Sequence, residues 1–95
     1  MVSIEIADET LRASLAAFLD ANFGGSSFDR DGALDLDFRS PGLSAEYELR
    51  LTERLLHAWH AREHPTPEID LLLTASSSAT FAGTQPVTIH RRLQL

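Results

Sequence analysis

The sequence predicts one α+β domain over residues 1–95, a two-layer sandwich in which two helices cover one face of a mainly antiparallel sheet. Two observations support this fold class. Short segments in which apolar and polar residues alternate, as in half-buried strands, occur between two longer segments whose apolar residues follow the period of a helix. Glycine and proline separate these segments, at Gly24-Gly25, Pro41-Gly42 and Pro65.

The chain is expected to begin with a strand followed by a helix. Val2, Ile4 and Ile6 alternate with polar residues, which predicts a strand with one buried face. Asp8 can cap the first turn of the helix, and Gly24-Gly25 ends it. The buried stripe of this helix is predicted to contain Leu11, Leu15, Phe18 and Leu19.

The stretch from Ser26 to Arg39 is expected to form a β-hairpin. A two-residue turn would place Phe28 opposite an acidic residue, Asp35. A three-residue loop, Arg30-Asp31-Gly32, instead places Phe28 opposite Leu34 and is therefore preferred. This register predicts a buried hairpin face made of Phe28, Leu34, Leu36 and Phe38.

The second helix is expected from Ser44 to Glu63, and the prolines that follow end it. Its core stripe is predicted at a spacing of three and four residues, at Tyr47, Leu51, Leu55, Ala58 and Trp59. A strand is expected from Ile69 to Ala75, then a connection of mostly small residues from Ser76 to Gln85, then a closing strand over residues 87–95. In the closing strand, Arg91 falls on the apolar side.

The order strand, helix, strand, strand, helix, strand resembles the ferredoxin-like arrangement, here with an additional C-terminal strand. The resemblance concerns element order alone. Because this arrangement hosts many unrelated activities, it implies none in particular.

Charge and composition exclude several classes of function. Fourteen acidic residues against eight arginines give a net charge of -6, which repels nucleic acid. The absence of cysteine excludes disulfides, thiolate metal sites and cysteine nucleophiles. No apolar run approaches the length of a bilayer span, and the first residues, MVSIEIADET, lack the pattern of a secretory signal. We therefore expect a cytoplasmic protein without a nucleic-acid or membrane partner.

Three histidines on the second helix are the main candidates for chemistry. His57, His60 and His64 are three and four residues apart, a spacing at which imidazoles on one helix face can hold a transition metal. The same face carries arginine and glutamate, as a solvated surface does. We expect that no metal or other cofactor is bound there. The alternative is a metal-binding or small enzymatic domain that uses these histidines.

The function predicted from these observations is that of a small acidic protein-interaction or regulatory accessory domain, non-enzymatic and self-associating as a dimer. No nucleophile is paired with a base, and a sandwich of this size encloses little volume for a substrate. A small-molecule site between subunits is a second alternative. The expected interaction surface is the closing strand, with Val87, Ile89, Arg91, Leu93 and Leu95. Arg91 is expected at a rim, or paired with an acid such as Glu5, Asp35 or Asp37 of this or a neighbouring subunit.

Overall fold

The structure is a computed structural model that describes residues 1–39, 43–63, 69–76 and 88–95. It contains two helices and five strands in the predicted order, so the α+β class is confirmed. The elements are β1 (Val2–Glu5), α1 (Glu9–Asn22), β2 (Ser26–Arg30), β3 (Ala33–Asp37), α2 (Ala45–Glu63), β4 (Asp70–Ser76) and β5 (Thr88–Gln94). The expected connection from Ser76 to Gln85 falls outside the described residues except for Ser76, which ends β4.

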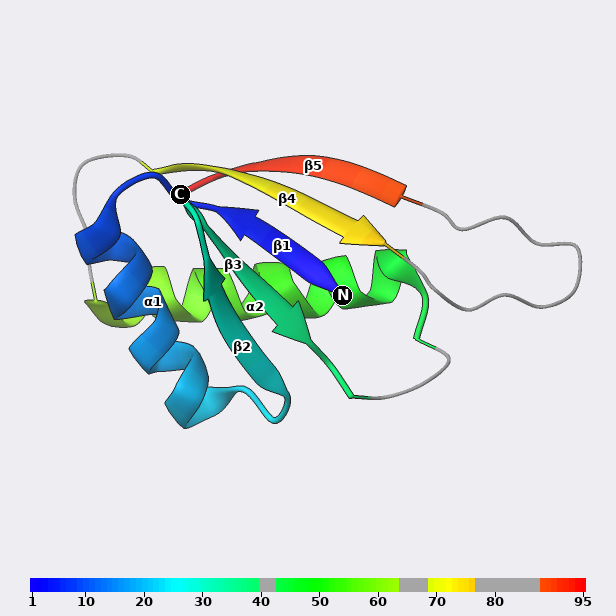
Figure 1. The fold of residues 1–95 in the computed structure, drawn as a ribbon, viewed down its shortest axis with the longest axis horizontal. Coiled ribbons are helices and arrows are strands. Elements are labelled where there is room, and N and C mark those ends of the chain that lie inside the picture. Colours follow the sequence, from blue (N-terminus) through cyan, green and yellow to red (C-terminus); the bar gives the residue numbers. More distant parts are fainter. Residues whose placement is uncertain (40–42, 64–68, 77–87) are drawn as a thin grey trace, which may run out of the picture.

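The five strands form one antiparallel sheet in the order β2-β3-β1-β4-β5 (Figure 1). The first strand of the chain is thus the central one, and the edges are β2 and β5. The expected ferredoxin-like arrangement is matched in part, with the sheet order β2-β3-β1-β4-β5, and the additional C-terminal strand, β5, lies beside β4 at the edge.

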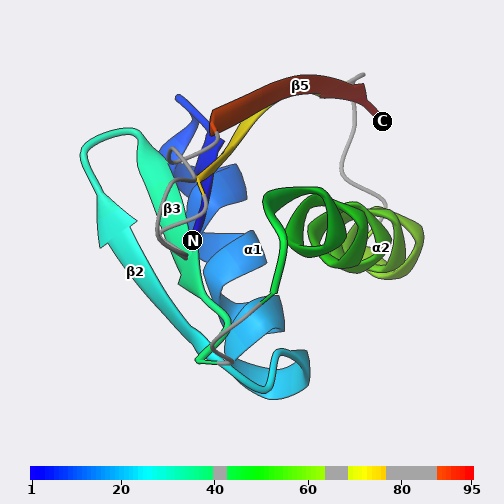
Figure 2. The same cartoon turned by 90° about the vertical axis from the view of Figure 1, so that its right-hand side faces the viewer.

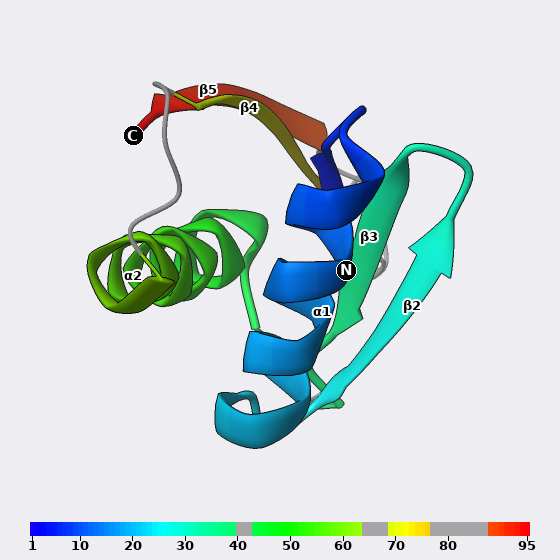
Figure 3. The ribbon, with the colours of Figure 1, turned by 90° about the vertical axis from the view of Figure 1, so that its left-hand side faces the viewer.

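Both helices lie inside the curve of the sheet, on the same face, as predicted (Figures 2 and 3). The core fills the space between this face and the helices. It is built mainly from alternate residues of the inner strands and from buried positions on the helices, which include Val2, Ile4, Leu15, Leu19, Leu34, Leu36, Leu49, Leu56, Trp59, Leu71 and Leu73. The other face of the sheet carries the intervening residues of the strands, most of which are polar.

The start of α1 agrees with the prediction. Asp8 is its N-cap, and the carboxylate accepts hydrogen bonds from the backbone N–H groups of Thr10 at 2.8 Å and Leu11 at 3.1 Å. At the other end, the N–H of Phe23 donates to the carbonyl of Leu19 at 2.7 Å, and the chain then turns into β2.

The predicted register of the β2–β3 hairpin is wrong by one residue. The structure has the two-residue turn Asp31-Gly32, in which Gly32 adopts a φ of 74°, and it pairs Phe28 with Asp35. Phe28 therefore lies on the open face of the sheet, 54% exposed, instead of in the core. Since side chains alternate along a strand, the shift moves every residue of β2 to the other face.

Polar contacts outside the hairpin pattern explain this register. Asp29, on the helix side of β2, accepts a hydrogen bond from Nε of Arg12 on α1 at 3.0 Å. On the open face, Nε of Arg30 lies 2.8 Å from a carboxylate oxygen of Asp35. Both charged residues of this edge strand thus have partners, and Phe28 remains on the solvent side.

The core stripe predicted for α2 is also wrong, except at Trp59. Tyr47 is 50% exposed, and the buried side of the helix is rotated by about 100°, one residue step, from the predicted one. The buried residues are Ala45, Glu48, Leu49, Thr52, Leu56 and Trp59.

Hydrogen bonds offset the cost of burying the two polar residues of this stripe, Glu48 and Thr52. Oγ1 of Thr52 donates to the carbonyl of Glu48 at 2.8 Å, and the carboxylate of Glu48 accepts a hydrogen bond from the Met1 amino group at 2.9 Å. Trp59 is fully buried, and its indole N–H donates to Oγ of Ser14 on α1 at 3.1 Å.

Candidate functional site

The flank of α2 that faces β5 is closed by ion pairs. Arg91 of β5 extends toward the helix, where Nη1 donates to Glu53 at 2.8 Å and Nη2 donates to both carboxylate oxygens of Glu46 at 3.0 Å. The hydrogen bond from Arg91 lowers the pKa of Glu46 below its ordinary value, and the bonds to Glu53 and Glu46 raise the pKa of Arg91. Arg50 adds a longer contact to Glu46, at 3.6 Å. This flank is therefore a charged seam between α2 and the edge of the sheet.

Within the chain, the acidic partners expected for Arg91 are wrong. Glu5, Asp35 and Asp37 alternate with the buried residues of β1 and β3 and so lie on the open face of the sheet. Arg91 lies on the helix side, so these acids cannot reach it within one chain.

The described residues of the predicted interaction row share this helix side of the sheet. Ile89, Leu93 and Leu95 are half-buried and pack against the core. Val87 lies outside the described residues. The row is therefore partly covered within the chain, and a partner could contact only the remainder of it.

The backbone of β5 presents a hydrogen-bonding edge. Ile69 and Leu95 exchange backbone hydrogen bonds of 3.0 and 2.8 Å across the β4–β5 pair. In an antiparallel pair, bonded and non-bonded positions alternate, so residues 89, 91 and 93 also bond toward β4. The N–H and C=O groups of Thr88, His90, Arg92 and Gln94 point outward, and no strand among the described residues pairs with them.

The structure describes two of the three candidate metal ligands. His57 is exposed and His60 is half-buried, and both lie on α2 away from the core; His64 lies outside the described residues. Within residues 1–39, 43–63, 69–76 and 88–95, no three histidine, aspartate or glutamate side chains are grouped so that they could hold a metal ion.

The polar network on the open face supports the sheet. Oγ of Ser3 donates to Asp35 at 2.6 Å, and Arg30 donates to both oxygens of the same carboxylate. The hydrogen bond from Arg30 lowers the pKa of Asp35. Asp35 is thus held as a carboxylate near neutral pH and is not poised to supply a proton.

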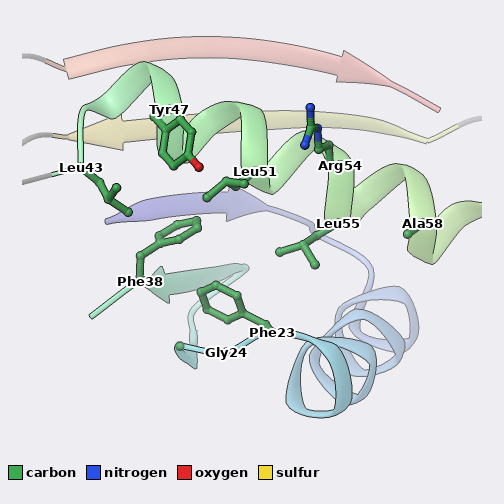
Figure 4. Close-up of a pocket in the computed structure, with 10 residues that line it drawn as sticks. Phe23, Gly24, Phe38, Leu43, Tyr47, Leu51, Arg54, Leu55 and Ala58 are labelled. Carbon is green, nitrogen blue, oxygen red and sulfur yellow. The ribbon is translucent and has the colours of Figure 1, made fainter. Parts of the chain in front are cut away.

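The other flank of α2 borders an open apolar groove of about 640 Å³ (Figure 4). Residues from the end of α1, the β2–β3 region and α2 line it, and Arg54 is the one charged residue among them. In Figure 4, Leu51 and Leu55 point from the helix toward the rings of Phe23 and Phe38, while the guanidinium of Arg54 points away from the groove floor. The lining residues are Phe23, Gly24, Gly25, Phe38, Leu43, Tyr47, Leu51, Arg54, Leu55 and Ala58.

A glycine holds the floor of this groove in place. A Cβ atom at Gly25 would lie 2.1 Å from the carbonyl oxygen of Asp37 and 2.7 Å from the ring of Phe23. Only glycine therefore allows β2 to start beside the end of β3 with the Phe23 ring above it. Phe23 in turn meets Phe38 edge to face, with ring centroids 5.0 Å apart.

The sequence analysis does not predict this groove, because it assigns to the core the side of α2 that carries Leu51 and Leu55. The available signal was the width of the apolar arc on the helix. Leu49, Leu56 and Trp59 form one apolar stripe, while Leu51 and Leu55 belong to a second, and one sheet face needs only the first. An unusually wide apolar arc predicts that part of it serves a different contact.

The geometry of the chain is the basis for assigning a function, because comparison with known proteins gives no relative. No family model, curated protein or solved structure matches the chain. Among the described residues, neither helix has the length and hydrophobicity that a transmembrane segment needs.

Proposed function

We propose that this chain is a non-enzymatic protein-binding domain that self-associates by antiparallel pairing of β5 with β5 of a second copy. The observation that carries the proposal is the outward edge of β5, where four residues present a regular ladder of backbone groups that no strand of the described residues pairs with. A free strand edge binds another strand through main-chain hydrogen bonds, and a two-fold axis satisfies both copies at once.

The contrast with the opposite edge supports the choice of β5. β5 has seven residues, pairs with β4 without interruption and contains no proline. Its charges are partnered within the chain, Arg91 by two glutamates and Arg92 by Asp70 at 3.5 Å. β2 has only five residues, and its inward-facing Asp29 is of the kind that protects an edge from pairing. A second copy at β5 would also cover the exposed remainder of Ile89 and Leu93.

This proposal extends to the fold and the location. We infer that the first six elements, β1 to β4 with the two helices, are a variant of the ferredoxin-like arrangement, and that the additional strand β5 is the interaction strand. A continuous sheet of two copies would bring the two α2 helices to the same face of the dimer. The acidic composition and the expected cytoplasmic location fit a partner that is another protein.

Sedimentation equilibrium tests self-association. The expected result is an average mass that rises to twice 10.5 kDa as the protein concentration increases to about 100 µM, because specific contacts have affinities of micromolar or better. A mass of 10.5 kDa throughout this range would overturn the proposal.

A pair of substitutions at His90 locates the interface. His90→Pro removes an N–H that points outward and leaves the β4–β5 hydrogen bonds in place, so we expect a folded monomer. His90→Ala removes the side chain and its 3.1 Å contact with Thr74 but keeps the N–H, so we expect a dimer. Circular dichroism confirms that both variants are folded, and Arg92→Pro replaces His90→Pro if the latter is not. A dimer that survives in the folded proline variant contradicts pairing through this edge.

A further inference from the structure

The groove beside α2 is a second surface, separate from the β5 edge, and its chemistry points to a different partner. It is elongated along the helix. From Tyr47 to Ala58 it follows twelve residues of α2, a rise of about 16 Å or three helical turns. An open apolar channel of this length matches three turns of a second helix laid beside α2, as in helix-in-groove recognition.

The groove is formed in the chain before any partner binds. Its floor is the edge-to-face pair Phe23–Phe38, and Gly25 fixes the position of Phe23. Its wall is provided by Leu51 and Leu55, whose helix is anchored from the other side by fully buried residues. A surface built on packed elements binds with a small ordering cost, which favours a specific ligand.

Charge identifies the partner's chemistry. The chain as a whole carries a net charge of -6, yet the described residues that line the groove include Arg54 and no carboxylate. Arg54 makes no ion pair with another described residue. Arg62 is exposed two turns further along the same side of the helix. The acids of α2 before its last residue are engaged elsewhere, since Glu46 and Glu53 bind Arg91.

Glu48, the third acidic residue of α2 before Glu63, is buried on the side of the helix that faces the sheet. The described lining of the groove therefore carries one arginine and no carboxylate although the chain is acidic, and salt screens the more distant charges within about 8–10 Å.

We propose that the groove binds an acidic amphipathic helix of a partner protein, with aliphatic or aromatic anchors at i, i+4, i+7 and i+11 over Phe23, Phe38, Leu51 and Leu55, and with a carboxylate at the flank that meets Arg54. The anchors fill the apolar floor, while the carboxylate makes a charge-assisted hydrogen bond that fixes orientation.

The test is a selection from a displayed library of sixteen-residue peptides, with leucine fixed at i, i+4, i+7 and i+11 and all other positions random. The expected result is enrichment of aspartate and glutamate beside one edge of the leucine stripe. The strongest selected peptide is then measured by fluorescence anisotropy against the intact protein and three variants. Arg54→Gln should weaken binding at least tenfold, and Leu51→Asn should weaken it further.

Arg92→Gln is the matched control, because it makes the same charge change on the open face of the sheet and should leave affinity unchanged. Circular dichroism establishes that each variant is folded, and Ala58→Asn replaces Leu51→Asn if the latter unfolds the chain. Three results would each overturn the proposal: no enrichment over the unselected library, enrichment of basic or neutral peptides, or affinity that Arg54→Gln does not change. Displacement of the selected peptide by sodium dodecanoate at equimolar concentration would overturn it as well and assign the groove to a small amphiphilic carboxylate.

The two proposals are tested separately. The selection uses His90→Pro alongside the unmodified chain, because this variant lacks the β5 edge and keeps the groove. Binding of the peptide by both proteins with equal affinity is expected, and loss of binding in the variant would show that the acidic peptide pairs at the edge instead.

Discussion

The two flanks of α2 differ in their contacts within the chain: one is covered by ion pairs and the other borders an open apolar groove. On the β5 side, Arg91 spans the gap and pairs with Glu46 and Glu53, and Arg50 adds a second contact to Glu46, so both carboxylates have partners within the chain. On the other side, Leu51 and Leu55 face an open groove, and Arg54, which also lines it, pairs with no acid in the part of the chain that the structure describes. Exposed apolar surface with an unneutralised charge beside it is a common property of binding surfaces. The difference suggests that one flank serves the fold and the other is kept for a partner.

The largest expected effect contrasts the core side of α2 with its open flank. Trp59→Ala should lower the free energy of unfolding by about 3–5 kcal/mol, because it empties a fully buried site and leaves Ser14 without its donor. Leu51→Ala, at a half-buried position in the groove, should cost about 1 kcal/mol. Urea unfolding followed by far-ultraviolet circular dichroism measures both. Equal losses would show that the groove belongs to the core.

The next effect concerns the floor of the groove. Gly25→Ala should cost about 1–3 kcal/mol, because the new Cβ would lie against the Asp37 carbonyl and the Phe23 ring. Gly24→Ala is the control, since nothing lies within 4 Å of its Cβ, and it should change stability by no more than about 0.5 kcal/mol. The nuclear Overhauser effect between Phe23 and Phe38 should weaken in the first variant alone. An intact Phe23–Phe38 contact in Gly25→Ala would contradict the positioning role of Gly25.

A smaller effect concerns the closed flank and depends on pH. Arg91→Met removes the group that lowers the pKa of Glu46. A carboxyl whose pKa is lower in the folded chain stabilises it above its ordinary pKa, and this contribution is lost as pH falls through the lowered folded value. The melting temperature of the unmodified chain should therefore exceed that of Arg91→Met at pH 7, and the gap should shrink below about pH 4. A gap that stays constant down to pH 3 would exclude the ion pairs as its source.

The smallest effect is expected at the exposed end of the groove. Tyr47→Ser should change the free energy of unfolding by no more than about 0.5 kcal/mol, since the side chain is 50% exposed. Thermal unfolding of the two proteins measures the difference. A substantial loss of stability would mean that Tyr47 is a packing residue after all, and that the open flank is narrower than its geometry indicates.

Local patterns in the sequence were sufficient to predict the helices and strands, their order, and that both helices cover the same face of the sheet. The cap at Asp8, the burial of Trp59 and the placement of Ile4 and Leu71 all follow from spacing and residue type. These features depend on neighbours in the chain or on the alternation of a strand, which a single sequence displays directly.

The predictions that are wrong concern features that depend on contacts between residues distant in the sequence. The hairpin register is tied to Arg12, seventeen residues before Asp29, and the partners of Arg91 lie on a helix about forty residues earlier. The rotation of α2 depends on Thr52 and Glu48 being satisfied when buried. A prediction from the apolar pattern alone places such polar residues at the surface. It therefore assigned to the core the stripe with Leu51 and Leu55, which lines the groove.

The central place of β1 has a consequence for how the chain acquires its structure. β1 is made first, yet it bonds to β3 about thirty residues later and to β4 about seventy residues later, with Val2 opposite both Leu36 and Ala75. Pairings of such long sequence separation are slow to form, because much chain must be ordered before they are gained. During synthesis, the middle of the sheet therefore cannot be completed until β4 has left the ribosome, and until then β1 has one neighbour at most.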